Sequence, residues 1–212
     1  MTRSELASPE LAAVEVHGMT RASFILRGAL TAGAVYGATA VSPYVGNALA
    51  ATGGGDVDIL NFALTLEFLE TVFYKHKAKT VGLSGQAKST AALFASEEQQ
   101  HVDALTKAIT ASGGTPVKHP TFVFPVTNEA SFLKLALTLE NVGVGAYNGA
   151  GPSLQSKALL AAAGSIVQIE ARHAATIALL TMELGMITPN GAFDKPLTKT
   201  QVLAAAGPLI KK

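Results

Sequence analysis

A chain of 212 residues is long enough for one ordinary domain with a substantial core, or for two small domains. Hydrophobic residues make up 49% of it and charged residues 15%, a composition that excludes an intrinsically disordered chain. The net charge of +1 and the lack of dense Lys/Arg runs predict that nucleic acid is not a partner. Because the chain has no cysteine, any metal ion must be held by His, Asp, Glu or backbone oxygen.

Residues 1–55 are predicted to be an export signal followed by a linker. The apolar run from 28 to 41 is too short and too rich in Ala, Gly and Thr for a membrane span, and Ala48-Leu49-Ala50 has the small-x-small form of a signal-peptidase site. The stretch before this run resembles a twin-arginine signal in which Ala22 replaces the second arginine. We therefore expect an exported protein of the periplasm, the cell envelope or the medium, without a membrane span after cleavage. The alternative is a retained arm that packs on the domain or anchors it to a membrane.

From Asp56 onward the sequence predicts helices with few interruptions. They are expected at 56–80 with Asp56 or Asp58 as the cap, from Ser84-Gly85 to Gly113-Gly114, at 129–148 with Asn128 as the cap, from Pro152-Ser153 to Gly185, and at 199–206. Between the second and third helices, the prolines of residues 115–127 exclude a helix, yet the apolar residues there favour burial.

The connections between the four long helices are thus short, long and short. This pattern predicts an all-α fold, an antiparallel four-helix bundle of two hairpins joined by a long crossover, with a short C-terminal helix. The chain divides into residues 1–55, the signal and linker; 56–187, the bundle; and 188–212, a tail with the short helix.

A pattern of glutamate, tyrosine and histidine occurs twice within the predicted bundle. The segment Ala63-Leu64-Thr65-Leu66-Glu67 recurs 73 residues later as Ala136-Leu137-Thr138-Leu139-Glu140, and a tyrosine follows each glutamate by seven positions, as Tyr74 and Tyr147. The motif Glu98-x-x-His101 recurs 72 residues later as Glu170-x-x-His173. Each predicted hairpin therefore contains one copy, and the two halves are related by a pseudo-twofold axis.

The repeated residues have the pattern of a dinuclear metal site. Residues three apart share one helix face, so each Glu-x-x-His pair can hold one ion. Di-iron and di-manganese bundles have this ligand arrangement, in which two helices each contribute one glutamate and the other two each contribute a Glu-x-x-His motif. Four carboxylates in an apolar core would repel each other and cost several kcal/mol each, whereas two divalent cations neutralise them. The predicted metal ligands are Glu67, Glu98, His101, Glu140, Glu170 and His173.

Comparison of the two halves separates these residues from other acids nearby. Glu70 corresponds to Gly143 and Glu97 to Ile169, so both are weaker ligand candidates. Either one is an acid that supports the ligands or an asymmetric extra ligand. Tyr74 and Tyr147 lie two turns after Glu67 and Glu140 on the same helix face, where they are core aromatics with satisfied hydroxyls or have a supporting or redox role.

These motifs resemble the ferritin-like superfamily, which also includes bacterioferritins, rubrerythrins and manganese catalases. The closer similarity is to a ferritin-like domain family of exported bacterial proteins and stress- or desiccation-related proteins. It rests on segments 66–70 and 73–74, on Glu97-Glu98 with His101, on 139–147, on the Pro-rich crossover and on Glu170 with His173, and it covers about residues 56–187. The resemblance implies a four-helix bundle with a buried dinuclear site on the six predicted ligands.

Several functions are compatible with such a site. The leading hypothesis is an oxidoreductase with two iron ions that oxidises Fe(II) with oxygen or peroxide, or otherwise consumes these oxidants. A second is dismutation of hydrogen peroxide at two manganese ions, since the same ligands suit both metals. A third is a non-enzymatic, stress-related envelope protein whose metal is structural or whose bundle is an interaction module. A homodimer is the default expectation for such bundles.

Overall fold

The computed structural model describes residues 55–211, so the predicted export signal falls almost entirely outside the described part. The first hairpin contains α4 (Asp56–Val72), a π-helix (Phe73–Lys77), α5 (Ala78–Thr80) and α6 (Gly85–Ala111). The second contains α7 (Glu129–Ala150), a 3-10 turn (Gly151–Ser153) and α8 (Lys157–Leu180). A 3-10 turn (Leu184–Met186), α9 (Lys199–Ala206) and a final 3-10 turn (Gly207–Leu209) complete the described chain.

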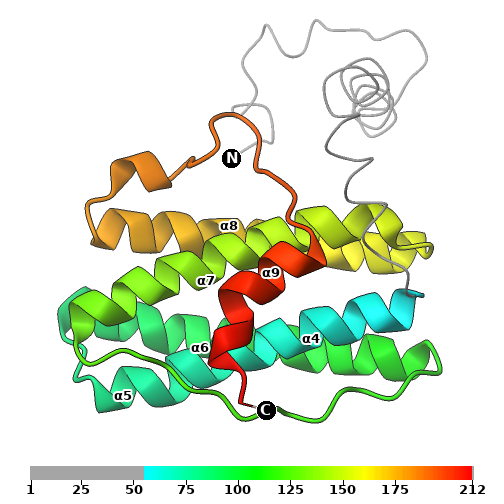
Figure 1. Ribbon diagram of the computed structural model, residues 1–212, viewed down its shortest axis with the longest axis horizontal. Helices are drawn as coiled ribbons and strands as arrows, with labels where there is room; N and C mark the ends of the chain where they lie inside the picture. The colour runs from blue at the N-terminus through cyan, green and yellow to red at the C-terminus, as the bar shows by residue number, and fades with distance from the viewer. Residues whose placement is uncertain (1–54, 212) are drawn as a thin grey trace, which may run out of the picture. The chain divides into compact units, whose positions relative to one another are not determined.

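The long helices form the predicted four-helix bundle. α4 packs mainly on α6 and α7 mainly on α8, while α4 contacts α7 and α6 contacts α8 between the hairpins. Figure 1 shows α4 and α7 running in opposite directions. Residues 55–211 contain no β-strand, only an isolated antiparallel bridge between Phe122 and Ile210. The all-α prediction is therefore confirmed.

The start of the third helix is as predicted. The Asn128 side chain accepts a hydrogen bond from the Ser131 backbone N–H at 2.9 Å, and the Ser131 hydroxyl oxygen accepts one from the Asn128 backbone N–H at 3.1 Å. This reciprocal pair satisfies two of the free N–H groups at a helix start.

Two predicted helix starts are wrong. The N-cap of α4 is Gly55, because the Asp56 carboxylate accepts the backbone N–H groups of Gln155 at 2.8 Å and Ser156 at 3.0 Å and so ties the two hairpins together. The fourth helix begins at Lys157, where the Ser156 hydroxyl caps it, since residues 151–153 form a separate 3-10 turn. This helix also ends at Leu180, before the predicted Gly185, and Met182 just beyond it has a φ of 58°.

One asparagine bonds the start of the long crossover to the first hairpin. The Asn61 side chain donates to the Thr115 carbonyl at 3.1 Å and accepts from the Val117 N–H at 2.6 Å. Further along, the backbone of Val123 donates to the Leu209 carbonyl at 2.8 Å. The crossover therefore joins the start of α4 to the C-terminal segment.

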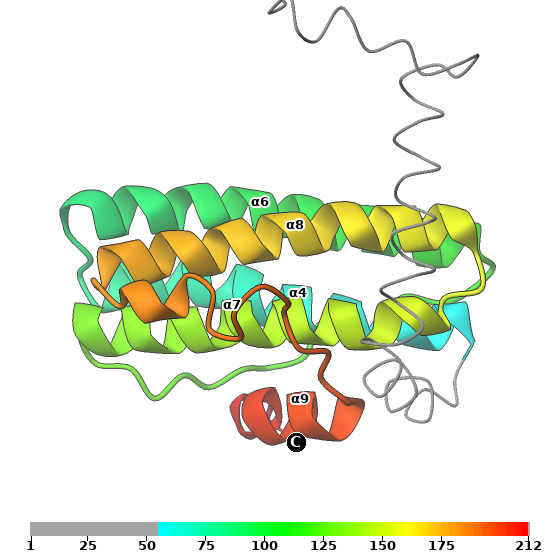
Figure 2. The same ribbon diagram turned by 90° about the horizontal axis from the view of Figure 1, so that it is seen from above.

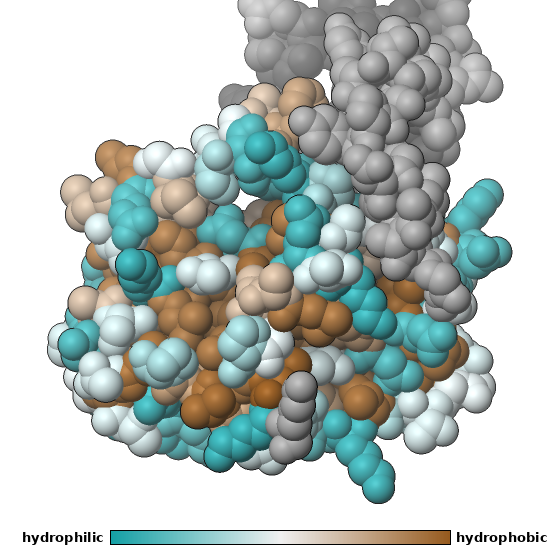
Figure 3. All heavy atoms as spheres, in the orientation of Figure 1, coloured by the Kyte–Doolittle hydropathy of each residue, from teal (hydrophilic) through white to brown (hydrophobic). Residues whose placement is uncertain are grey.

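The tail lies on the layer formed by α4 and α7, on the side away from α6 and α8 (Figures 1 and 2). Val202 and Ala206 of α9 belong to the same buried cluster as residues of α7, and Lys199 lies over the Phe62 ring at 5.1 Å. Figure 3 shows hydrophobic surface between hydrophilic groups on one face of the molecule. Val123 of the crossover and Leu203 of α9 are 46% and 44% exposed.

Two glycines of α7 allow the tail to approach closely. The Leu197 N–H donates to the Gly145 carbonyl at 2.8 Å, and a Cβ at Gly149 would lie 2.0 Å from the Leu197 carbonyl oxygen. Only a residue without a side chain fits at position 149, because its neighbour is rigid backbone.

We expect Gly149→Ala to displace the tail and to lower the unfolding free energy by about 1–3 kcal/mol, or the melting temperature by roughly 2–12 °C. Gly164→Ala in α8 is the matched control, because a Cβ there meets no atom within 4 Å. Thermal unfolding and limited proteolysis of segment 187–198 measure both effects. Equal melting temperatures and cleavage rates for the two variants would show that the tail is not held at Gly149.

Candidate metal centre

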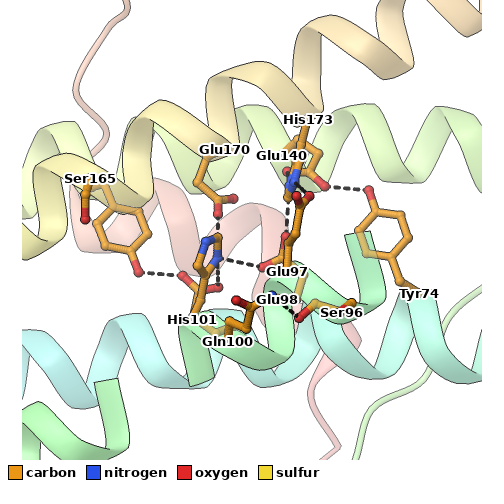
Figure 4. Close-up of polar contacts among 12 residues, drawn as sticks. Tyr74, Ser96, Glu97, Glu98, Gln100, His101, Glu140, Ser165, Glu170 and His173 are labelled. Carbon is orange, nitrogen blue, oxygen red and sulfur yellow. Dashed lines mark hydrogen bonds and ion pairs between the residues drawn. The ribbon is translucent and has the colours of Figure 1, made fainter. Parts of the chain in front are cut away.

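The bundle brings all six predicted ligands into its interior. Glu67 comes from α4, Glu98 and His101 from α6, Glu140 from α7, and Glu170 and His173 from α8. The four glutamates have no exposed surface, and the histidines are 8% and 2% exposed. Figure 4 shows Glu98, Glu140 and Glu170 directed toward the two histidines. The i,i+3 spacing on α6 and α8 thus places each histidine beside the glutamate of its own motif.

The six residues form two overlapping groups. One consists of Glu67, Glu98, His101 and Glu170, the other of Glu98, Glu140, Glu170 and His173, and in each group the ligand atoms lie within 4.8 Å of one another. Glu98 and Glu170 belong to both groups. These two carboxylates would be shared if each group held one ion, while each remaining glutamate and histidine belongs to one group. The sequence alone did not separate bridging from terminal residues.

Hydrogen bonding among the six side chains is incomplete. His101 Nδ1 lies 3.1–3.2 Å from oxygens of Glu67, Glu98 and Glu170, but a ring nitrogen carries only one hydrogen. His173 Nδ1 lies 2.9 Å from Glu98 Oε1 in a direction that does not suit a hydrogen bond. Five buried atoms of these six side chains have no hydrogen-bond partner: Glu98 Oε1, Glu140 Oε2, both carboxylate oxygens of Glu170, and His173 Nδ1. Carboxylate oxygens and imidazole nitrogens are ligands that divalent metal ions accept. Their convergence with unsatisfied hydrogen-bonding capacity is therefore what a metal site would show.

Glu97 lies beside His173 on the side opposite to the cluster. His173 Nε2 donates to Glu97 Oε2 at 2.8 Å, which leaves Nδ1 directed at the two carboxylates. The Phe94 ring stacks on the same imidazole with centroids 3.8 Å apart. A carboxylate that accepts a hydrogen bond from the ring nitrogen facing away from a metal site orients the histidine and makes the other nitrogen a stronger ligand. Glu97 is therefore a supporting acid, one of the two roles that the sequence left open.

The two tyrosines bond across the halves of the bundle. The Tyr74 hydroxyl donates to Glu140 Oε1 at 2.5 Å, and the Tyr147 hydroxyl donates to Glu67 Oε1 at 2.5 Å. Seven residues along a helix correspond to about 10.5 Å, so each tyrosine is far from the glutamate of its own helix. The antiparallel neighbour brings the other glutamate to that level instead. Both hydroxyls are satisfied, and both support a terminal glutamate.

Glu70 is a fifth carboxylate in the same core and is only 3% exposed. It belongs to neither group of converging ligand atoms. A Cβ at Gly143, its counterpart in the repeat, would lie 2.8 Å from Glu170 Oε2 and 3.5 Å from Glu70 Oε1. The glycine thus leaves room for two carboxylates on one side of the centre.

Burial in one core shifts the protonation of these acids. Burial raises the pKa of Glu67 to about 8, and burial together with the neighbouring carboxylates raises the pKa of Glu70 and Glu170 well above the ordinary value. Burial also raises the pKa of Glu140. For Glu98, burial acts in the same direction, but the two adjacent histidines outweigh it and lower the pKa to about 2.

The histidines and tyrosines are shifted by the same neighbours. Burial would lower the pKa of both histidines, but contacts with the glutamates outweigh it and raise the pKa to about 12 for His101 and about 11 for His173. Burial and the adjacent glutamate raise the pKa of Tyr74 and Tyr147, so both hydroxyls remain donors. The metal-free cluster therefore retains protons, which metal ions would replace.

A buried set of four glutamates and two histidines, contributed by four antiparallel helices, is the residue set of helical bundles that can hold metal ions. A family model described as ferritin-like domain matches residues 55–183. The chain therefore belongs to the ferritin-like domain family, as its motifs predicted. A search of the curated proteins found no match. Among residues 55–211, no helix is both long and apolar enough to cross a bilayer.

We expect the metal-depleted protein to lose stability as pH rises from about 4.5 to about 11, first through Glu67 and then through His173. Groups with a raised folded-state pKa, such as Glu67 at about 8 and His173 at about 11, contribute stability below their unfolded pKa values and lose it as pH rises. Only Glu98, with a pKa of about 2, has the opposite dependence, and its contribution falls below pH 4.5. Urea unfolding in the presence of a chelator measures the trend. A flat profile would contradict the assigned protonation.

We expect Gly143→Ala to lower metal affinity about 10- to 100-fold while the fold is retained, because the new methyl group displaces the Glu170 carboxylate. Gly164→Ala is again the control, and each alanine also gains up to about 1 kcal/mol of helix stability. Metal titration followed by calorimetry, together with thermal unfolding, separates affinity from stability. If both variants bind metal like wild type, Gly143 has no role in the centre.

Proposed function

We propose that this protein is a dinuclear metalloprotein whose buried site holds two iron ions and consumes oxygen or peroxide, with Fe(II) or another reductant as the electron source. The observation that carries the proposal is the pair of ligand groups that share Glu98 and Glu170. Four carboxylates balance two divalent cations, and neutral imidazoles complete the two sets. Bound iron would supply the electron transfer to the oxidant.

The surrounding residues suit a redox site better than a purely structural one. Tyr74 and Tyr147 hold the terminal glutamates at one oxygen each, which fixes their positions. Glu170 has no hydrogen bond at either oxygen, so both oxygens would be available to hold metal ions. The cluster is enclosed by buried apolar residues of both halves, which keep bulk water away.

The cellular location is a separate part of the proposal. It is supported by the signal-like sequence of residues 1–55, which indicates export to the periplasm, the cell envelope or the medium. The stress-related subtype and a homodimer stay predictions from the resemblance.

We expect purified full-length protein to contain about two iron ions per chain and to oxidise added Fe(II) in air. Glu98→Gln and Glu170→Gln each remove a shared carboxylate oxygen and should lose at least one ion together with the oxidation. Asp103→Asn, an exposed change on the same helix, is the matched control and should retain both. Elemental analysis and oxygen consumption measure the two effects.

Three results would contradict this proposal in different ways. Trace metal only, with unchanged metal content and melting in the Glu98 and Glu170 variants, excludes the dinuclear site. Two bound manganese ions with oxygen release from hydrogen peroxide indicate dismutation instead. Two bound ions without reaction toward oxygen or peroxide indicate a structural metal.

A further inference from the structure

A cavity of about 500 Å³ lies beside Tyr74, between the π-helix and α5 on one side and the first half of α6 on the other. Its buried wall consists of Tyr74, Leu83 and Ala95. Its volume falls within the range of about 300–1,000 Å³ that is typical of small-molecule sites. The cavity is therefore far larger than a single inorganic ion requires.

Three lysines line the cavity at its exposed edge, and none of its lining residues is acidic. They are Lys75, Lys79 and Lys88. Lys75 Nζ is held by Gln99 Oε1 at 2.7 Å. Glu129 is bonded to the loop that precedes α6, where its carboxylate accepts hydrogen bonds from the backbone N–H and the hydroxyl of Ser84. Glu129 is not among the residues that line the cavity. Positive charge above an apolar wall is complementary to an organic anion with an apolar body.

The charged residues that line this cavity are not repeated in the second half of the bundle, although the repeat relates the two tyrosines. The counterparts of Lys75 and Lys88 are Asn148 and Leu160. Tyr147 instead borders a cavity of about 20 Å³ whose lining is entirely apolar. The π-helix at Phe73–Lys77 likewise has no counterpart in α7, which is α-helical through Ala150. The lysines and the π-helix beside the cavity are thus particular to the first hairpin.

We propose that this cavity binds a small organic anion, with its charged group at the lysines and its apolar body against Tyr74, Leu83 and Ala95. The Tyr74 ring forms part of the wall while its hydroxyl bonds Glu140. A ligand there touches the residue that holds one terminal glutamate of the metal centre. The binding itself depends on neither metal nor redox activity.

Calorimetric titration of the full chain with octanoate tests this proposal, in metal-depleted and metal-loaded protein alike. We expect saturable binding of one octanoate per chain, and much weaker binding of octanol, which lacks the charge, and of acetate, which lacks the apolar body. Lys79→Gln with Lys88→Gln should weaken octanoate binding about tenfold, since two partly exposed charge interactions are lost.

Lys107→Gln with Lys157→Gln is the matched control, because these lysines are also exposed but lie outside the cavity. Ala92→Phe, at an exposed lining position, should occupy part of the cavity and weaken octanoate binding without a change in the core. No saturable binding of octanoate, equal losses in the two double variants, octanol binding as tight as octanoate, or unchanged binding by Ala92→Phe would each overturn the proposal. Loss of iron chemistry with octanoate binding intact would affect only the proposed function.

Discussion

The constraint on which the structure depends is the repulsion among five carboxylates in one apolar core. Glu67, Glu70, Glu98, Glu140 and Glu170 are all buried, and no lysine or arginine forms an ion pair with them among residues 55–211. Isolated carboxylates cannot remain charged in such a place. Protons and the two histidines offset the charge in the metal-free cluster, and divalent ions offset it more completely. The bundle is therefore organised around a cluster whose negative charge must be offset by protons, histidines or metal ions.

The surrounding contacts hold this cluster in place from outside. Tyrosine hydroxyls and Glu97 position individual ligand candidates, and Gly143 leaves space for the Glu170 carboxylate. At the ends of the bundle, the Asp56 carboxylate joins the two hairpins through backbone N–H groups. These interactions matter because the ligands come from four helices, so any sliding of one hairpin against the other would separate them.

The two halves share their central residues but differ at the periphery. The repeat preserves glutamate, tyrosine and histidine positions, while Glu70, Glu97 and the lysines of the first hairpin have no equivalents in the second. As a result, one tyrosine borders a lysine-lined cavity and the other a small apolar one. The two tyrosines beside the nearly symmetric centre therefore have chemically different surroundings.

The sequence by itself determined the helical bundle, its crossover and the six converging residues. Helix periodicity and i,i+3 spacing are local properties of the sequence, and the repeated motif identifies which residues they bring to one face. It also separated Glu70 and Glu97 from the repeated residues. Only the tertiary structure decided which glutamates are shared, which tyrosine bonds which glutamate, and that the Asp56 carboxylate joins the hairpins and does not cap α4. Those pairings depend on how far one helix is shifted along its antiparallel neighbour. Spacing between residues of one helix contains no information about that shift.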